Sequence, residues 1–460
     1  MRGSRRLVLV LAWVLGGLPV VRPWPGASGA SAAPACFLPL EDGRCLPPPT
    51  LADSAPPPAA HAQAASASRG PGVLVKRKGD VPPGAFRAGL AAAGFPGAEA
   101  LAVPRWWRIP VPPGEDPEAL AARLRRRPDI ETAEVDRPVR IAFTPNDPYY
   151  GSYQWNLPKI RAPQAWDVIT GTAGVWIAIV DTGVDYNHPD LASSRLWLGW
   201  DFANGDNNPM DDHGHGTHVA GIAGANTNNG QGVAGVCWGC DLLAVKVLRA
   251  DGVGYDSWVA QGIRYAADWG VAFGKRTVIN LSLGSPDPSR VLADAVAYAQ
   301  GQGALIVAAA GNNGQNQPFY PAAYPGVIGV AATDSSDQRA SFSNWGSHVD
   351  IAAPGVAILS TDLTIYSWPY GWKRGTSMAA PHVAGVAGLV WSVWCRAPAT
   401  MISDILLSTA RDLGDPGWDP FYGYGRVDAE AAIRWRPAVP SLPPPGPYRQ
   451  FLPLIASSCP

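Results

Sequence analysis

The stretch GTSMAAPHVAGVAG, residues 375–388, decides the fold of this chain. Ser377 opens a helical pattern rich in small residues, which predicts a buried helix. A serine near the first turn of such a helix faces free backbone N–H groups and the positive end of the helix dipole, where a developing oxyanion is stabilised. We expect Pro381 in that first turn, where its missing N–H does little harm. The stretch therefore predicts a serine that is placed to act as a nucleophile.

Two motifs upstream supply partners for this serine. Asp181, in VDTGVD, follows the continuous apolar run VWIAIV, which is typical of a parallel strand buried on both faces. It should lie at the carboxyl end of that strand, where open α/β sheets place their active sites, and Gly183 lets the chain turn there. His215, in DHGHGTHVAG, precedes a second helical stretch of small residues. Aspartate first, histidine second and serine last is one of the few orders typical of a nucleophilic triad.

The chemistry explains why these residue types must meet. A serine hydroxyl is a poor nucleophile at neutral pH, so a neutral imidazole, here His215, has to take its proton during attack on a carbonyl carbon. A buried carboxylate then fixes the imidazole tautomer and stabilises the imidazolium, which is the role open to Asp181. Asn312, in the turn of VAAAGNNG, is the candidate oxyanion donor together with the backbone N–H of Ser377.

Neighbouring residues offer alternative readings. His213 and His218 flank His215 and carry the same imidazole group. We expect His218, one turn into the helix, to hydrogen-bond structurally, and His213 to lie in a loop. Ser282, in LSLG, has no nearby histidine that would activate it. An Asp and a Gly after a strand often make only a turn, so each motif depends on the others for its functional interpretation.

Several stretches together resemble a known family. DTGVDYNHPDL, HGHGTHVAGIAG, LSLG, AAAGNNG and GTSMAAPHVAG are similar to the signature motifs of the subtilases, and TPNDPYY with QAWDVITG resembles thermitase-like members. The resemblance covers about residues 144–434. It implies an α/β fold, with an open, mainly parallel sheet and helices on both faces, and a monomeric serine endopeptidase that acts on polypeptides. An ester hydrolase with the same triad and a catalytically silent binding module are the alternatives.

The resemblance also implies how a peptide is held. Ser282, Leu283 and Gly284 would pair with the substrate backbone on one side, and the segment 251–256 on the other. Gly311 belongs to the same substrate-binding set. Phe319, in QPFYP, would lie at the floor of the main specificity pocket, where relatives carry a small or polar residue. We expect this pocket to be narrowed toward medium-sized apolar side chains.

Calcium is the cofactor that the resemblance implies, in a structural role. Hard cations take carboxylate and carbonyl oxygens that distant loops bring together. A first site would use Asp147 and Asp190 with the loop 226–233. Its loop ligands would come from Asn226, Asn229, Gln231 and Val233.

A second calcium site would use Asp201 and Asp206. Here the chain departs from its relatives, because Asn204 and Met210 stand where they carry Asp and Gln. A methionine still offers a backbone carbonyl. Solvated loop acids are the alternative at both sites.

The amino-terminal part of the chain is expected to be removable. Arginines precede LVLVLAWVLGGLPVV and then small residues, which predicts a secretory signal over residues 1–33 and an extracellular protein. A membrane anchor would require a longer apolar run. Residues 34–71 are dominated by Ala, Pro and Ser and predict a linker.

Residues 72–143 predict a small α+β unit with the order β-α-β-β-α-β. It resembles the inhibitory propeptide of subtilases, a partner that occupies the substrate cleft; a permanent accessory domain is the alternative. Cleavage is expected near residues 141–145, ahead of a catalytic domain over residues 144–436. The proline-rich stretch 437–460 predicts an extended tail, for which we expect a role in surface retention.

Composition and cysteines agree with this organisation. The 460 residues, 47% of them hydrophobic, carry a formal net charge of −1, which allows a large core but gives no global basic surface for nucleic acid. Cys237 and Cys240 predict a local disulfide, since no further ligands complete a zinc site. Cys36 and Cys45 would be lost with the leader, and Cys395, among apolar neighbours, is expected to be a buried thiol.

Overall fold

The computed structural model describes residues 71–136, 143–193 and 195–436, together with three two-residue strands near the amino terminus. The predicted signal at 1–33 and the tail at 437–460 lie outside the described residues. The three short strands fall in the segment expected to be a linker. They are β1 (Leu38–Pro39) and β2 (Cys45–Leu46), which pair with each other, and β3 (Thr50–Leu51).

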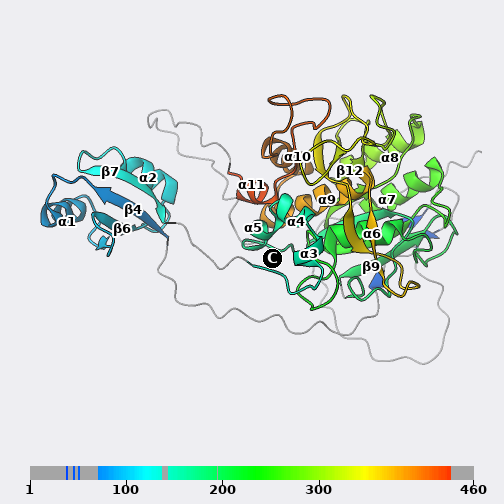
Figure 1. The fold of residues 1–460 in the computed structure, drawn as a ribbon, viewed down its shortest axis with the longest axis horizontal. Helices are drawn as coiled ribbons and strands as arrows, with labels where there is room; N and C mark the ends of the chain where they lie inside the picture. The colour runs from blue at the N-terminus through cyan, green and yellow to red at the C-terminus, as the bar shows by residue number, and fades with distance from the viewer. Residues whose placement is uncertain are drawn as a thin grey trace, which may run out of the picture. The chain divides into compact units, whose positions relative to one another are not determined.

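Residues 72–136 form a small α+β body with its own core, drawn in blue to cyan in Figure 1. Strand β4 alternates buried and partly exposed residues, so one of its faces, with Val73 and Val75, packs under helices that contribute Phe86 and Leu120. The element order is the expected β-α-β-β-α-β, and the antiparallel sheet has the strand order β5-β6-β4-β7. The elements are β4 (Gly72–Arg77), α1 (Pro83–Ala92), β5 (Glu99–Ala100), β6 (Trp106–Pro110), α2 (Pro117–Leu124) and β7 (Ile130–Asp136).

An open sheet with the strand order β14-β13-β12-β11-β8-β10-β9-β3 organises the larger part of the chain. Seven strands run parallel, and only the edge strand β3 is antiparallel to its neighbour β9. The central apolar runs produce this sheet because strands buried on both faces cannot alternate with polar residues. The parallel strands are β8 (Val175–Asp181), β9 (Leu196–Asp201), β10 (Asp241–Lys246), β11 (Arg276–Leu281), β12 (Leu305–Ala309), β13 (Val327–Thr333) and β14 (Ile351–Pro354).

Helices cover both faces of this sheet, as expected (Figure 1). The two faces can be read from β8, where Ile177 lies against Gly388 of α9 and Val180 lies against Gly262 of α7. Helices α6 and α9 pack together on one face, and α7 and α8 pack together on the other. The helices of this part are α3 (Tyr150–Tyr153), α4 (Asn156–Lys159), α5 (Ala162–Trp166), α6 (His215–Gly224), α7 (Asp256–Ala272), α8 (Arg290–Gly301), α9 (Thr376–Val393), α10 (Ala399–Ser408) and α11 (Ala429–Arg434). A separate hairpin is formed by β15 (Ile358–Thr361) and β16 (Tyr370–Lys373).

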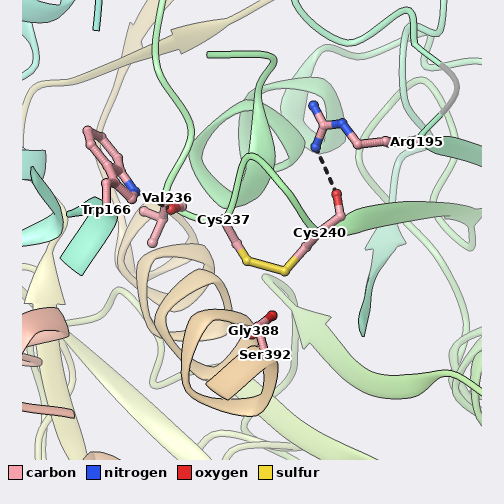
Figure 2. The surroundings of a disulfide bond; sticks show 7 residues. All are labelled: Trp166, Arg195, Val236, Cys237, Cys240, Gly388 and Ser392. Atoms are coloured by element: carbon pink, nitrogen blue, oxygen red, sulfur yellow. Dashed lines mark hydrogen bonds between the residues drawn. A yellow bond between two sulfur atoms is a disulfide. The ribbon is translucent and has the colours of Figure 1, made fainter. Parts of the chain in front are cut away.

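The expected local disulfide joins Cys237 and Cys240 and packs against α9 (Figure 2). A Cβ added at Gly388 would lie 2.9 Å from the sulfur of Cys240, so the glycine admits the disulfide to the surface of the helix. Arg195 donates a hydrogen bond to the carbonyl of Cys240 (2.9 Å) and fixes the other side of the turn. The disulfide-bonded turn therefore packs against the middle of α9, the helix that carries Ser377 in its first turn.

The expectation of a free thiol at Cys395 is wrong, because this cysteine is disulfide-bonded. Its apolar neighbours in sequence belong to α9, but Cys395 itself lies two residues beyond the helix end and is only partly buried. Across the described parts of the chain, no helix combines the length and apolar character needed to cross a bilayer.

Candidate active site

The sequence motifs meet at one edge of the sheet. Asp181 is the last residue of β8, and Asn312 follows the end of β12. His215 is the first residue of α6, and Ser377 is the second of α9. Because the carboxyl ends of parallel strands share one edge, and each following helix begins there, residues 196 positions apart become neighbours. His215, Asn312 and Ser377 line a cleft of about 570 Å³.

Asp181 and His215 form a directly bonded pair. The imidazole Nδ1 lies 2.7 Å from Oδ1 of Asp181, and the carboxylate is fully buried. An ionised carboxylate only accepts, so Nδ1 carries the proton and Nε2 is left as an acceptor. Burial lowers the pKa of His215, but the charge and the hydrogen bond of Asp181 outweigh it, so the net pKa is raised. The pair thus holds one tautomer and favours the imidazolium.

Asp211 connects the loops that carry this pair, and sequence reasoning missed it. Its carboxylate is almost completely buried and accepts five hydrogen bonds. One comes from the hydroxyl of Thr182, next to Asp181, and others come from backbone N–H groups just before and within the first turn of α6. The N-cap position of α6 is Gly214, so no helix-capping pattern in the sequence marks Asp211 for this role. The donors are Thr182 Oγ1, His213 N, Gly214 N, Thr217 N and Thr217 Oγ1.

Ser377 and Ser282 exchange hydrogen bonds. The hydroxyl of Ser377 donates to the carbonyl of Ser282 (3.0 Å), and the hydroxyl of Ser282 donates to the carbonyl of Ser377 (2.8 Å). The expectation that Pro381 lies in the first helical turn is wrong, since it is the sixth residue of α9. A helical N–H at position 381 would have bonded to the carbonyl of Ser377, so the proline leaves that carbonyl free. Ser282 satisfies it, which gives this serine a structural use.

Two N–H donors converge beside Ser377. The side-chain oxygen of Asn312 accepts from the backbone N–H (2.8 Å) and the hydroxyl (3.0 Å) of Thr376. This fixes the amide orientation, so Nδ2 points away from Thr376. A Cβ added at Gly375 would lie 3.5 Å from that Nδ2 and 3.6 Å from the backbone N of Ser377. Both donors therefore border the same small space, as an anionic oxygen would require.

Comparison with known proteins identifies the family of this chain. The model of the subtilase family matches residues 172–425, which is more than half of the chain. The chain belongs to the subtilase family. It is 48% identical over 293 residues to thermitase from Thermoactinomyces vulgaris, covering 64% of this chain and 100% of that protein. A thermophilic serine proteinase from Bacillus sp. (strain AK1) is 44% identical over 318 residues, with 69% and 76% covered.

Solved structures show the same relationship. A protease from Pseudoalteromonas arctica PAMC 21717 aligns with a TM-score of 0.56 at 35% identity, covering 63% of this chain and 99% of the other. Family membership makes this subtilase a serine endopeptidase.

The neighbouring histidines of this subtilase have other surroundings. His218 is fully buried, and its Nε2 lies 3.1 Å and 2.9 Å from the carbonyl oxygens of Ile358 and Gly371. Burial lowers the pKa of His218 to about 3, so it stays neutral and structural. His213 lines the cleft from its loop, and its backbone N–H bonds to Asp211. In this segment it is His215 that contacts Asp181.

The predicted peptide-binding residues border the cleft of the subtilase. Ser282, Leu283 and Gly284 line it together with residues 251–256. Phe319 also lines it, and its ring lies against the backbone at Gly284 and Gly311, where added Cβ atoms would come within 2.6 Å and 2.9 Å of ring atoms. Gly311 is not itself a lining residue but supports the ring. Phe319 therefore fills space between two backbone segments at the edge of the cleft.

Loops of the predicted first calcium site also come together. Oδ2 of Asp147 accepts from the backbone N–H of Asn228 (2.8 Å), whereas Oδ1 is buried without a hydrogen-bond partner. The carboxylate of Asp190 accepts from the amide of Asn229 (2.9 Å) and the backbone N–H of Val233 (2.9 Å). Burial raises the pKa of Asp147 to about 6, and the charge of Asp190 adds to this rise.

The remaining predicted calcium ligands differ in exposure and in whether their oxygen atoms already accept hydrogen bonds. The side-chain oxygen of Asn226 accepts from Arg195 (2.6 Å), and Gln231 is exposed. At the second site, both carboxylate oxygens of Asp201 accept from loop residues 203 and 204, and Asp206 is exposed. In the described parts of the subtilase, no three His, Cys, Asp or Glu side chains cluster as metal ligands. Any cation at the first site would need amide and carbonyl oxygens beside the two carboxylates.

Proposed function

We propose that this subtilase hydrolyses peptide bonds with Ser377 as nucleophile, His215 as general base, Asp181 as its orienting carboxylate and Asn312 as oxyanion donor. The observation that carries the proposal is the 2.7 Å bond that fixes the His215 tautomer and leaves Nε2 as acceptor in the cleft of Ser377. When a substrate carbonyl enters, the Ser377 hydroxyl turns from the Ser282 carbonyl to Nε2, which takes its proton as the oxygen attacks.

The later steps follow from the same groups. The carbonyl oxygen becomes negative and moves into the space between Asn312 Nδ2 and the Ser377 backbone N–H. His215 then returns its proton to the leaving amine, which breaks the peptide bond and leaves an acyl ester on Ser377. A water molecule, deprotonated by His215, hydrolyses this ester and restores the enzyme.

A serine-directed sulfonyl fluoride tests the assignment. We expect it to modify Ser377 once per molecule and to abolish casein hydrolysis in parallel, because only an activated hydroxyl reacts. The modified residue is identified by peptide mass spectrometry. Hydrolysis of ester substrates but not of casein would point to an esterase, and no labelling would point to a silent module.

The casein fragments also report on Phe319, since a narrowed pocket should give few cleavages after Phe, Tyr or Trp.

We further propose that the enzyme is made as a secreted, self-processed precursor that works as a monomer. The α+β body of residues 72–136 supports a propeptide, because it has its own core and could fold as a unit. The predicted signal at 1–33 supports export. Domain boundaries at 33, 71, 143 and 436 and surface retention through the tail at 437–460 remain proposals on the basis of sequence.

Structural calcium at the first site is part of the proposal. The partnerless Oδ1 of Asp147 fits a cation, because a buried carboxylate oxygen without a donor is costly unless a positive group faces it. Asp147, Asp190 and carbonyl oxygens of the loop 226–233 would hold the ion. Calcium at Asp201 and Asp206 stays a prediction from the sequence, and loop amides already donate to the carboxylate oxygens of Asp201.

Removing calcium should speed thermal inactivation. At a calcium concentration of about 100 times Kd, a single site contributes about 2.7 kcal/mol to the free energy of unfolding. We therefore expect excess EGTA to shorten the half-life at elevated temperature by about two orders of magnitude, and Asp190→Asn to remove most of the EGTA effect. Asp287→Asn, which changes an exposed loop acid, serves as control. An EGTA effect of wild-type size in Asp190→Asn would remove the site from this position.

A further inference from the structure

The substrate cleft has a one-sided charge. Among the described residues, those that line it include two carboxylates, Asp251 and Asp256, and no lysine or arginine. Both belong to the segment that ends at the first residue of α7. A cleft with low-dielectric walls and a single sign of charge favours ligands of the opposite sign. A carboxylate can attract a substrate cation only if it is not already paired within the chain.

Asp251 already forms an ion pair within the chain. Its Oδ2 lies 2.8 Å from an amino group of Arg249, and its Oδ1 accepts from the backbone N–H of Val253 (3.0 Å). The hydrogen bond from Arg249 lowers the pKa of Asp251, in keeping with a stable ion pair. Because its carboxylate is already paired within this loop, we expect Asp251 to attract a substrate cation only weakly.

Asp256 differs from its neighbour. It is exposed, and among the described residues no donor or cation pairs with its carboxylate. Val259, one helical turn further along α7, is buried and lines the same cleft, and so does Leu292 on α8. The start of α8 is close as well. Helix α8 packs along α7, and Leu292 near its start borders the same space as Asp256.

These neighbours define a small subsite with aliphatic walls and a carboxylate at its rim. A lysine or arginine side chain has the matching form, since its methylene stem covers apolar surface while its cation reaches a polar group. An acidic side chain would meet an unpaired like charge. A purely apolar side chain would gain the walls but leave the carboxylate unused.

We propose that Asp256, with Val259 and Leu292, forms a subsite that selects a lysine or arginine of the polypeptide substrate at a position removed from the scissile bond. The inference rests on the proposed function, because it assumes that peptide occupies this cleft. In the proposed function the residue next to the scissile bond enters the pocket bordered by Phe319, so the basic preference concerns a different position. Asp256 acts here on substrate choice and not on the chemical step.

A scanning set of fluorogenic peptides tests this subsite. Each peptide carries lysine, norleucine or glutamate at one position, and kcat/KM is measured against enzyme titrated with the sulfonyl fluoride. We expect the wild type to prefer lysine over norleucine about fivefold at one position, which corresponds to about 1 kcal/mol, the upper end for an exposed ion pair. Glutamate should be the poorest there. Raising the salt concentration to about 1 M should weaken the preference, because it screens the charges.

Two variants separate the carboxylates. Asp256→Asn should bring the lysine-to-norleucine ratio to about one at that position, and Asp256→Lys should turn the preference toward glutamate. Asp251→Asn should keep the ratio, since Arg249 already pairs with that charge. A ratio near one in the wild type at every position, or a ratio unchanged in Asp256→Asn, would overturn the subsite while leaving the protease assignment intact. If the wild type cleaves neither casein nor any peptide of the set, both proposals fail.

Discussion

Replacing Ser377 with alanine is expected to lower kcat by about 10⁶-fold, a magnitude taken over from removal of the nucleophile in a subtilisin. The Ser377 hydroxyl is the group that forms the acyl ester in the proposed mechanism, so the variant would keep only the smaller rate enhancement from the oxyanion donors and substrate binding. The backbone N–H of Ser377 stays in place, and the lost hydrogen bond to the Ser282 carbonyl is a single one. Casein hydrolysis and fluorogenic turnover measure the loss.

The same variant reports on self-processing. If the enzyme removes its own amino-terminal part, secreted Ser377→Ala protein should keep residues 34–143, whereas the wild type should begin near residues 141–145. N-terminal sequencing of both proteins distinguishes these outcomes. Ser336→Ala, a change at an exposed loop serine, should behave like the wild type. If purified Ser377→Ala protein still removed its amino-terminal part completely, the site of Ser377 would not be responsible for the processing.

Much of the fold and of the candidate site could be predicted because it is written in local patterns. The apolar run before Asp181 indicated a buried parallel strand, and the strand is buried along its whole length. The positions of Asp181, His215 and Asn312 at element ends follow from that rule alone. A strand end is a local property, and parallel strands then bring their ends together without further information from the sequence.

What could not be predicted depends on contacts between remote segments. The use of Ser282 to satisfy the carbonyl that Pro381 leaves free joins residues almost 100 positions apart. Nothing in LSLG indicates this contact, and α9 begins at Thr376, one residue before Ser377, which moves Pro381 beyond the first turn. The bond state of Cys395 has the same character, since apolar neighbours do not reveal a distant partner.

Asp211 is an intermediate case. Its place in the loop just before an expected helix is visible in the sequence, but the hydrogen bond from Thr182 crosses from the loop after β8 to this loop. Only the folded chain shows that one carboxylate fixes both halves of the Asp181–His215 pair. Asp181 therefore stabilises the charged form of His215, and Asp211 holds the loop and the helix start that position it.

Replacing Asp181 with asparagine should therefore lower kcat by about 10⁴-fold, the loss typical of a triad that keeps its geometry but loses its carboxylate. Asparagine cannot enforce the tautomer with the proton on Nδ1, because its own NH₂ group can face the imidazole. It also removes the negative charge that stabilises the imidazolium. Steady-state turnover of an ester and of a peptide substrate measures the loss.

The pH dependence of this variant gives the sharper test. The general base works when neutral, so kcat/KM rises as pH increases through the pKa of His215. In the wild type that pKa is raised, because the charge and hydrogen bond of Asp181 outweigh burial. In Asp181→Asn burial is left to dominate, so the pKa falls and the acidic limb of the profile should move to lower pH. Asp287→Asn should leave the limb in place. A limb that stays put in Asp181→Asn, or moves to higher pH, would mean that another group acts as the base.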